Sequence, residues 1–117
     1  MKSKSKPIGI TLGDINGIGP EVTAKALSTS AIKKLGQFII FGNQLVLKRH
    51  LPKSLLNIEY IESPHFNQTK WRLGKPNRVS GQCSLDYLNS AVEFLKKKKI
   101  SALVTAPVCK EAIAKFQ

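Results

Sequence analysis

The sequence predicts an α/β fold in which helices cover both faces of a mainly parallel sheet, giving three layers. Short apolar segments alternate with segments of helical periodicity along the chain. A glycine-rich segment lies between the first predicted strand and the first predicted helix, as in many α/β units. A chain of 117 residues with 42% hydrophobic and 22% charged residues has the composition of a globular domain.

The segment Gly13–Val22 is the most informative part of the chain. It follows Ile8–Leu12, whose alternating, branched side chains predict a buried strand, and it contains three glycines, a proline and two carboxylates. Pro20 suits the first turn of a helix, glycines allow a close backbone approach, and a helix start offers free N–H groups. We interpret this segment as a ligand-facing loop, called the Gly loop below. A tight turn without a ligand is the alternative.

The remaining elements follow in order from apolar patterns and turn residues. The all-apolar run Phe38–Phe41 predicts a fully buried strand, and the more alternating Ile58–Glu62 predicts an edge strand or a less buried one. Polar residues, glycine and proline predict a long loop from 63 to 81. The other expected elements are a helix from Pro20 to about Lys34, a short helix over Gln44–His50, a helix from about Ser84 to Lys97 and a strand over Ile100–Val104.

The expected helix from Ser84 to Lys97 has one apolar stripe. Leu85, Leu88, Val92 and Leu95 recur at helical spacing, which is typical of a helix packed against a sheet. Such a stripe is not that of a nucleic-acid recognition helix.

The Gly loop does not match two common phosphate-binding motifs. A P-loop requires Gly-Lys and a hydroxyl residue after four intervening positions, but Ile18 follows Gly17. A Rossmann fingerprint requires a third glycine where this chain has Val22. The sequence therefore excludes a standard dinucleotide fingerprint.

Two motifs resemble the 4-hydroxythreonine-4-phosphate dehydrogenase family. The first is the Gly loop with its Gly-Asp-x-x-Gly-Ile-Gly-Pro-Glu pattern, and the second is Thr105-Ala106-Pro107-x-x-Lys110 after the last strand. Gly81 stands where that family has a glycine-rich approach to its third helix. The resemblance spans the chain, with a more distant likeness to isocitrate and isopropylmalate dehydrogenases. It implies an incomplete amino-terminal part of an isocitrate/isopropylmalate dehydrogenase-like fold.

The resemblance also implies a reaction. Members of the family that this chain resembles are NAD-dependent homodimeric enzymes. They oxidise a phosphorylated amino acid in pyridoxal phosphate biosynthesis and use a divalent metal, which is zinc, cobalt or magnesium. By resemblance, Asp14, Gly17, Gly19 and Thr105 would line the cleft or bind cofactor. Lys110 would bind substrate as a point charge, and a solvated lysine is the alternative.

The chain departs from the family pattern at several places. Ile15-Asn16 replaces Pro-Ala, and Cys109 replaces Asn. The family's metal-binding histidines follow the lysine motif, and we do not expect His50 or His65 to bind metal. We therefore expect residues 1–117 to be the amino-terminal part of one α/β domain, with a flexible basic start at 1–7 and the remainder of the family chain absent. We expect no catalytic residue and no complete NAD or metal site.

The formal net charge of +12 raises an alternative class of function, because basic chains bind nucleic acid through counterion release. The lysines are scattered, however, and the densest run, Lys96–Lys99, suits the end of a helix. We therefore do not expect nucleic-acid binding. An inactive remnant and a small basic nucleic-acid-binding protein stay open as alternatives to a dehydrogenase fragment.

The sequence also bears on where the protein is found. No apolar run has the length of a membrane span, and no secretory signal follows the basic start. Cys83 and Cys109 lack the spacing of a zinc or redox site, so we expect reduced thiols. These features predict a cytoplasmic protein without a membrane partner.

Overall fold

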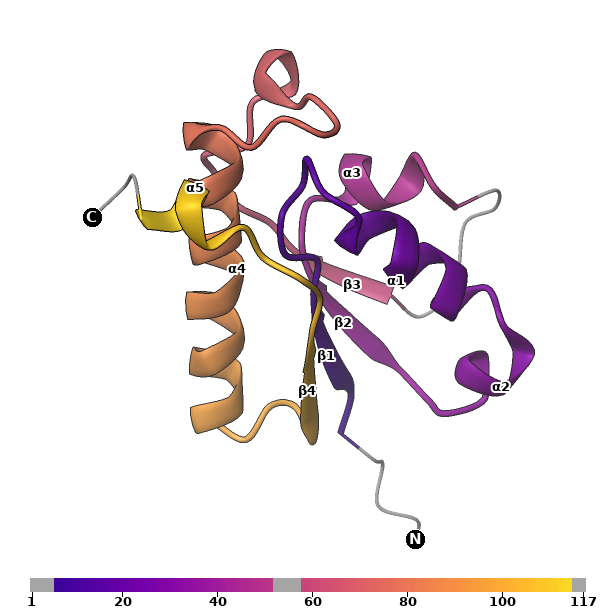
Figure 1. Ribbon diagram of the computed structural model, residues 1–117. Coiled ribbons are helices and arrows are strands. Elements are labelled where there is room, and N and C mark those ends of the chain that lie inside the picture. Colours follow the sequence, from indigo (N-terminus) through magenta and orange to yellow (C-terminus); the bar gives the residue numbers. More distant parts are fainter. Residues whose placement is uncertain (1–5, 52–57, 115–117) are drawn as a thin grey trace, which may run out of the picture.

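A single parallel sheet organises the computed structural model, which describes residues 6–51 and 58–114. The strand order is β3-β2-β1-β4 (Figure 1). Lys6 and Pro7, the described part of the predicted flexible start, accept hydrogen bonds from Ser101. The elements are β1 (Ile8–Thr11), α1 (Gly19–Leu27), α2 (Ser30–Lys33), β2 (Phe38–Phe41), α3 (Gln44–Lys48), β3 (Ile58–Ile61), the 3₁₀ helix η1 (Gln68–Lys70), α4 (Arg78–Lys96), β4 (Ala102–Thr105) and α5 (Lys110–Ala114).

The central strand β1 pairs in parallel with a strand on each side. Ile8 is in register with Phe38 of β2 and with Ala102 of β4. The outer strand β3 pairs with β2, which confirms the predicted edge position, and all four residues of β2 are buried as expected. The predicted strand positions are thus confirmed to within two residues at each end.

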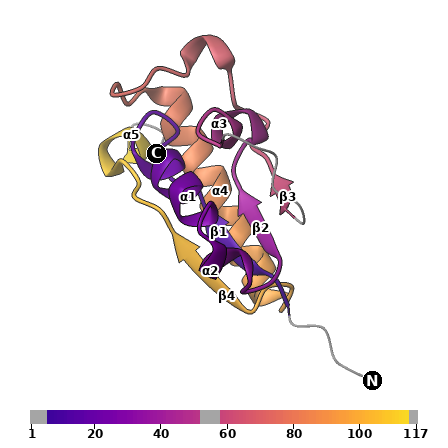
Figure 2. The same cartoon turned by 90° about the vertical axis from the view of Figure 1, so that its right-hand side faces the viewer.

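Helices cover both faces of the sheet, which confirms the predicted three layers. Figures 1 and 2 show α4 on one face and α1 with α3 on the other, while α5 packs against α4. The buried core between these layers includes Leu12, Ile15, Leu27, Val46 and Leu47 together with β2. Across the described ranges, no helix combines the length and apolarity that a membrane span requires.

The helix predicted from Pro20 to Lys34 is wrong in its continuity. The structure has two helices, because α1 ends at Leu27 and α2 begins at Ser30. The Ser28 hydroxyl donates to the Ala24 carbonyl at 2.8 Å, and the Thr29 hydroxyl accepts from the Ile32 N–H at 3.4 Å. Serine and threonine side chains compete with helical backbone bonds in this way, so the Ser-Thr-Ser run ends one helix and begins another.

The long loop predicted from 63 to 81 is also too long. Helix α4 begins at Arg78, and η1 lies within the remaining loop. Asn77 caps α4 through a reciprocal pair of hydrogen bonds: its side chain accepts from the Ser80 N–H, while the Ser80 hydroxyl accepts from the Asn77 N–H. This capping box satisfies backbone groups of the first turn and fixes where the helix starts.

The predicted packing stripe of α4 is wrong as well. Val92 is 43% exposed and Leu95 is 44% exposed, while Leu85 and Leu88 are only half-buried. A different face of the helix, made of small residues and one tyrosine, is buried against the sheet. Small side chains allow the helix to approach the sheet closely, so this face is buried in place of the more apolar one. The buried face of α4 consists of Ser80, Gly81, Cys83, Ser84, Tyr87 and Ala91.

Gly81 therefore lies inside α4 and not in an approach to it. A Cβ at this position would collide with the carbonyl oxygen of Ala112 in α5. The glycine lets the two helices pack closely, which explains why a glycine is required there.

The capping box gives a testable prediction. Replacing Asn77 with alanine removes the acceptor for the Ser80 N–H, and we expect the free energy of unfolding to fall by about 1 kcal/mol. Urea unfolding of both proteins measures the change. Asn67→Ala is the matched control, because Asn67 caps only the short η1. An equal loss in both variants would contradict the role of the α4 cap.

Candidate functional site

The candidate site lies at the carboxyl edge of the sheet, where β1 and β4 end side by side. After β1 the chain continues into α1 on one face, and after β4 it continues into α5 beside α4 on the other face (Figure 1). Adjacent parallel strands whose continuations diverge form a switch point, where open α/β sheets usually bind ligands. The Gly loop and the segment 105–110 both begin at this point.

The two sequence motifs are in direct contact. The Asp14 N–H donates to the Pro107 carbonyl at 3.1 Å, and the Ala106 N–H donates to the Thr11 carbonyl at 3.0 Å. From α4, the Ser84 hydroxyl donates to the Gly13 carbonyl at 2.9 Å. The structure therefore brings the first and last motifs together and fastens the Gly loop to α4.

The glycines of the Gly loop have different structural reasons. Gly13 has a φ of +72°, and a Cβ there would collide with the Pro107 carbonyl oxygen. A Cβ on Gly19 would collide with the Leu12 carbonyl oxygen. The nearest atoms to a Cβ on Gly17 would belong to the Asp14 side chain, with Oδ2 at 3.2 Å, so no backbone collision arises there. Packing against the protein thus explains Gly13 and Gly19.

The other predicted site residues lie around the same edge with different exposure. The Asp14 side chain is buried, and its Oδ1 atom accepts the Asn16 N–H at 2.9 Å in a local turn. Thr105 is the last residue of β4 and Lys110 the first of α5, and both are exposed. Their roles toward a ligand stay predictions.

Asn16 is a functional candidate that sequence reasoning missed. Its side chain is 1% exposed, its Oδ1 accepts from the Arg72 N–H at 2.7 Å, and its Nδ2 donates to the Lys75 carbonyl at 2.9 Å. The Asn16 carbonyl also accepts from the Gly74 N–H at 2.6 Å. The signal in the sequence was the departure at Ile15-Asn16, because this asparagine anchors a segment more than fifty residues away.

A buried polar network joins the ends of β2 and β3 to α4. The Tyr87 hydroxyl donates to Asn43 Oδ1 at 2.6 Å and accepts the Asn43 N–H at 3.1 Å. Asn43 Oδ1 also accepts from the Ser63 N–H at 3.0 Å. Burial raises the pKa of Tyr87 far above its ordinary value, so the hydroxyl stays protonated and structural.

The Asp86 carboxylate contacts three polar side chains near the end of β3. Its Oδ2 atom accepts from the Ser63 hydroxyl at 2.6 Å and lies 2.7 Å from His65 Nδ1, while Gln82 Nε2 donates to Oδ1 at 3.0 Å. Burial raises the pKa of this carboxyl, but the hydrogen bonds from Ser63, His65 and Gln82 outweigh burial and hold the pKa below 3.8. A cavity of about 500 Å³ opens beside this cluster, lined by His65, Arg78, Val79 and Gln82.

Potential metal ligands and thiols are separate from one another in the described residues. In the described ranges, no group of three or more His, Cys, Asp and Glu side chains is placed to hold a metal ion. Cys83 and Cys109 are free thiols. Burial raises the pKa of the Cys83 thiol to about 11, so this sulfur stays protonated at neutral pH.

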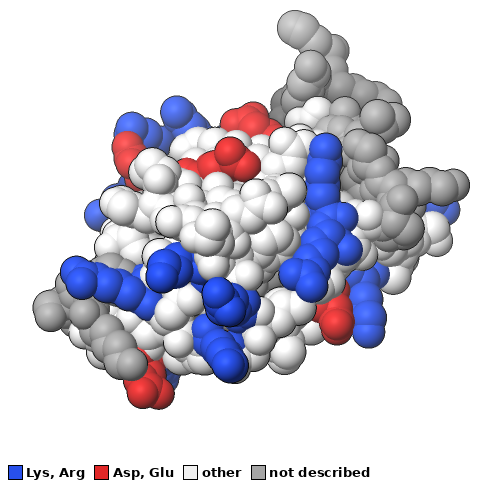
Figure 3. Space-filling model, turned by 90° about the horizontal axis from the view of Figure 1, so that it is seen from above, with Lys and Arg blue, Asp and Glu red and all other residues white. Residues whose placement is uncertain are grey.

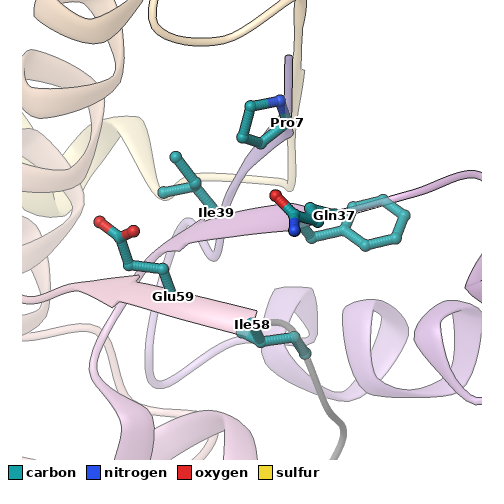
Figure 4. A pocket seen from close by; sticks show the side chains of 6 residues that line it. Pro7, Gln37, Ile39, Ile58 and Glu59 are labelled. Atoms are coloured by element: carbon teal, nitrogen blue, oxygen red, sulfur yellow. The ribbon is translucent and has the colours of Figure 1, made fainter. Parts of the chain in front are cut away.

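A second cavity lies at the opposite edge of the sheet. Figure 4 shows Pro7, Gln37, Ile39, Ile58 and Glu59 around it, and its volume is about 220 Å³. It faces the amino ends of the strands, away from both sequence motifs. Its position gives it no part in the candidate site, because ligands of open α/β sheets bind at the carboxyl ends.

Comparisons with known proteins agree with the sequence motifs. The family model described as "Pyridoxal phosphate biosynthetic protein PdxA" matches residues 31–117. The chain is 28% identical to a 4-hydroxythreonine-4-phosphate dehydrogenase of Trichlorobacter lovleyi, covering 97% of this chain and 39% of that protein. It is 30% identical to a protein of Oceanobacillus iheyensis that is provisionally named D-threonate 4-phosphate dehydrogenase, covering 97% of this chain and 40% of the relative.

A solved structure has the same arrangement of elements. The crystal structure of 4-hydroxythreonine-4-phosphate dehydrogenase from Klebsiella pneumoniae superposes with a TM-score of 0.83 at 25% identity, covering 95% of this chain and 40% of that chain. The chain thus spans about 40% of the length of the relatives it matches.

The packing of the glycines gives a prediction that separates Gly13 from Gly17. We expect Gly13→Ala to lower the free energy of unfolding by more than about 2 kcal/mol, because its φ is positive and its Cβ collides with backbone. Gly17→Ala is the control and should change that free energy by less than about 1 kcal/mol. Urea unfolding measures both. A larger loss at Gly17 than at Gly13 would contradict this account of the loop.

The Asp86 cluster predicts a pH dependence of stability. Because the folded pKa of Asp86 lies below 3.8, the ionised carboxylate stabilises the fold above that pH. This contribution is lost as pH falls through 3.8 toward the lower folded pKa. Thermal melts between pH 7 and pH 2 should show a steeper acid loss for the unmodified chain than for Asp86→Asn. Parallel curves for the two proteins would show that the cluster contributes nothing.

Proposed function

Because the chain belongs to the PdxA family of pyridoxal phosphate biosynthetic proteins, we propose that it forms part of an NAD-dependent dehydrogenase acting on 4-hydroxythreonine 4-phosphate. In this proposal the chain supplies one wall of the active-site cleft. In the same proposal, the catalytic and metal-binding groups come from regions that its relatives have beyond the matched 40%.

The contact between the two motifs is the observation that carries this proposal. The Asp14 N–H to Pro107 carbonyl bond joins the Gly loop to the segment that ends in Lys110. Both segments lie at the switch point of the sheet, where a ligand can meet backbone groups from two loops at once. A protein that had the fold but no ligand at this edge would not require both motifs there, so their contact favours a binding role.

Four of the predicted site residues have a role toward the ligand in the proposal, while Gly19 allows the close packing of the Gly loop. Gly17 and Asp14 border the cleft, and the absence of a side chain on Gly17 leaves room beside the Asp14 carboxylate. Thr105 offers an exposed hydroxyl at the end of β4. Lys110, at the exposed start of α5, attracts an anionic group of the substrate as a point charge.

The described residues offer contacts for NAD but no ligand set for the metal that the family implies. The described residues contain no ligand set for zinc, cobalt or magnesium, so no step of the proposed reaction is assigned to a metal here. NAD would accept the hydride from the secondary alcohol when bound. In the described residues, Asp14, Gly17 and Thr105 are proposed as its contacts, because packing against the protein already explains Gly13 and Gly19.

The relatives are named after two substrates of the proposed class. Both 4-hydroxythreonine 4-phosphate and D-threonate 4-phosphate carry a carboxylate, a secondary hydroxyl and a terminal phosphate. They differ at the second carbon, where one has an amino group and the other a hydroxyl. We propose the amino-acid substrate from the sequence motifs, together with the family's homodimer and a cytoplasmic location.

The proposal predicts activity for a completed enzyme and a role for Lys110 in it. The enzyme joins this chain to the remainder of the Trichlorobacter lovleyi relative, and NADH formation from 4-hydroxythreonine 4-phosphate is followed with added zinc, cobalt or magnesium. We expect turnover by the completed enzyme and none by the 117-residue chain alone. Lys110→Gln should raise KM about tenfold or more with a smaller change in kcat, because one charged hydrogen bond is lost.

Lys96→Gln is the matched control for Lys110→Gln. It removes the same charge from the exposed last turn of α4, far from the candidate site, and should leave KM within about twofold. Equal KM values for all three enzymes would remove Lys110 from substrate binding. Turnover by the 117-residue chain alone would show that the cleft needs no further region.

A further inference from the structure

The pair Asn16-Gly17 in the Gly loop is chemically distinctive. It is the one place in the 117-residue sequence where an asparagine directly precedes a glycine. The backbone nitrogen after an asparagine can attack the carbonyl carbon of the side chain, and glycine favours this step because it has no Cβ to obstruct the approach. Whether the reaction occurs depends on how the fold holds the two reacting groups.

The fold holds both ends of the Asn16 side-chain amide. Its Oδ1 accepts from the Arg72 N–H at 2.7 Å, and its Nδ2 donates to the Lys75 carbonyl at 2.9 Å. The Gly74 N–H donates to the Asn16 backbone carbonyl at 2.6 Å. Residues 72–75, which we call the docked turn, thus close over a buried side chain. The amide cannot turn toward the next backbone nitrogen without breaking both of its side-chain hydrogen bonds.

The attacking nitrogen is also engaged. The Gly17 N–H donates to the Asp14 carbonyl at 3.0 Å, and the Asn16 N–H donates to Asp14 Oδ1 at 2.9 Å. The nitrogen attacks only after it has lost its proton, so a hydrogen bond from this N–H opposes the step. The closed arrangement therefore keeps the asparagine unreacted, and the reaction requires the docked turn to open.

Such an opening is a local event. The docked turn belongs to the loop between β3 and α4, which stands out at the top of Figure 1. A neighbouring contact helps to close it, because the Trp71 indole N–H donates to the Ile15 carbonyl at 3.0 Å and the Trp71 ring packs against Phe66. A loop held by a few hydrogen bonds opens at a lower free-energy cost than the core.

The charge around the pair favours an anionic nitrogen once the turn is open. The sequence has no Asp or Glu between Glu62 and Asp86, and the docked turn carries the exposed Arg72 and Lys75. Figure 3 looks onto this side of the molecule from above Figure 1, and most of the charged side chains on it are Lys or Arg. A positive potential offsets the nearby Asp14 carboxylate and stabilises the deprotonated nitrogen.

We propose that Asn16 is a site of spontaneous deamidation, which stays unreacted while the docked turn is closed and is modified when the turn opens. The Gly17 nitrogen forms a bond to Asn16 Cγ while the bond from Cγ to Nδ2 breaks, and the proton of the Gly17 nitrogen leaves with Nδ2 as ammonia. The product is a succinimide. Water then adds to one of its two carbonyl carbons and opens the ring, which gives aspartate or isoaspartate at position 16. Nothing is oxidised or reduced, and water is the co-reactant.

Either product changes how the turn docks. A carboxylate at position 16 still accepts from the Arg72 N–H but has no N–H to donate to the Lys75 carbonyl, so two oxygens face each other. Isoaspartate also lengthens the backbone by one methylene group, in a loop where a Cβ on Gly13 or Gly19 would collide with backbone. Opening therefore allows the reaction, and the product opposes closing. The modification does not depend on the proposed dehydrogenase function.

The test follows deamidation of the 117-residue chain by peptide mass spectrometry, which distinguishes asparagine, aspartate and isoaspartate. The folded chain is incubated at mildly alkaline pH beside the same chain in concentrated urea. We expect modification of Asn16 to be about a hundredfold slower in the folded chain, because several hydrogen bonds must break first. Gly17→Ala should slow the reaction in urea about tenfold or more, since its Cβ obstructs the attacking nitrogen. Equal rates in the folded chain and in urea, or an unmodified Asn16 in urea, would overturn the proposal.

A second variant tests the docked turn itself. Trp71→Phe keeps an aromatic ring but removes the hydrogen bond to the Ile15 carbonyl, and we expect Asn16 to react about threefold faster or more in the folded chain. Tyr87→Phe is the matched control, because it removes a hydroxyl that bonds Asn43 at the end of β2. It should leave the rate within about twofold. Equal acceleration by both variants would assign the reaction to global unfolding and overturn the role of the turn.

Asn16→Asp tests the effect of the product. We expect the backbone amides of Arg72 and Gly74 to exchange hydrogen about tenfold faster or more than in the unmodified chain. Asn67→Asp is the control, because it adds the same charge to the same loop and keeps the acceptor for the Thr69 N–H. It should change these exchange rates by less than about twofold. Unchanged exchange in Asn16→Asp would overturn the claim that the product opposes closing.

Discussion

Backbone hydrogen bonds between residues 11–14 and residues 106–107 hold the carboxyl edge of the sheet together. They extend the pairing of β1 with β4 beyond the strands, so two loops from opposite ends of the sequence form one surface. Gly13 makes this possible, because only a residue without a Cβ fits against the Pro107 carbonyl. The position of every candidate ligand contact depends on this junction, including the buried Asp14 side chain and the segment 72–75 that Asn16 holds.

Local sequence patterns were sufficient for the strands and the layers but not for the helix boundaries. The apolar run Phe38–Phe41 is buried by its own composition, whereas the break at Ser28–Thr29 depends on hydroxyl groups that compete with backbone bonds. The buried face of α4 was missed because small residues around Tyr87 pack closer than the apolar stripe containing Val92. Which strands pair with β1, and which loop Asn16 anchors, are long-range contacts that no local pattern contains.

The cationic side chains of this chain lie in two different surroundings. Lysines after the last turn of α4 lie beside a carboxylate or an aromatic ring, while Arg72 and Lys75 emerge from a loop pinned to the candidate site. Net charge alone therefore says little about function, because the backbone that presents the charge decides what it meets. The departure from the family motif at Asn16 has a structural reason, because the Asn16 side chain holds the loop from which Arg72 and Lys75 emerge.

The register of β1 also has a consequence for how the chain folds. Ile8 pairs with Ala102, which lies more than ninety residues later in the sequence, so one side of the central strand gains its partner only after a long segment has been made. Such non-local pairing slows folding, because a long chain segment must be closed before the contacts form. During synthesis, the edge of β1 that later binds β4 stays unpaired while β2 already protects the other edge. Until β4 is in place, that strand edge can pair with other chains, so the late pairing of β1 with β4 favours association during folding.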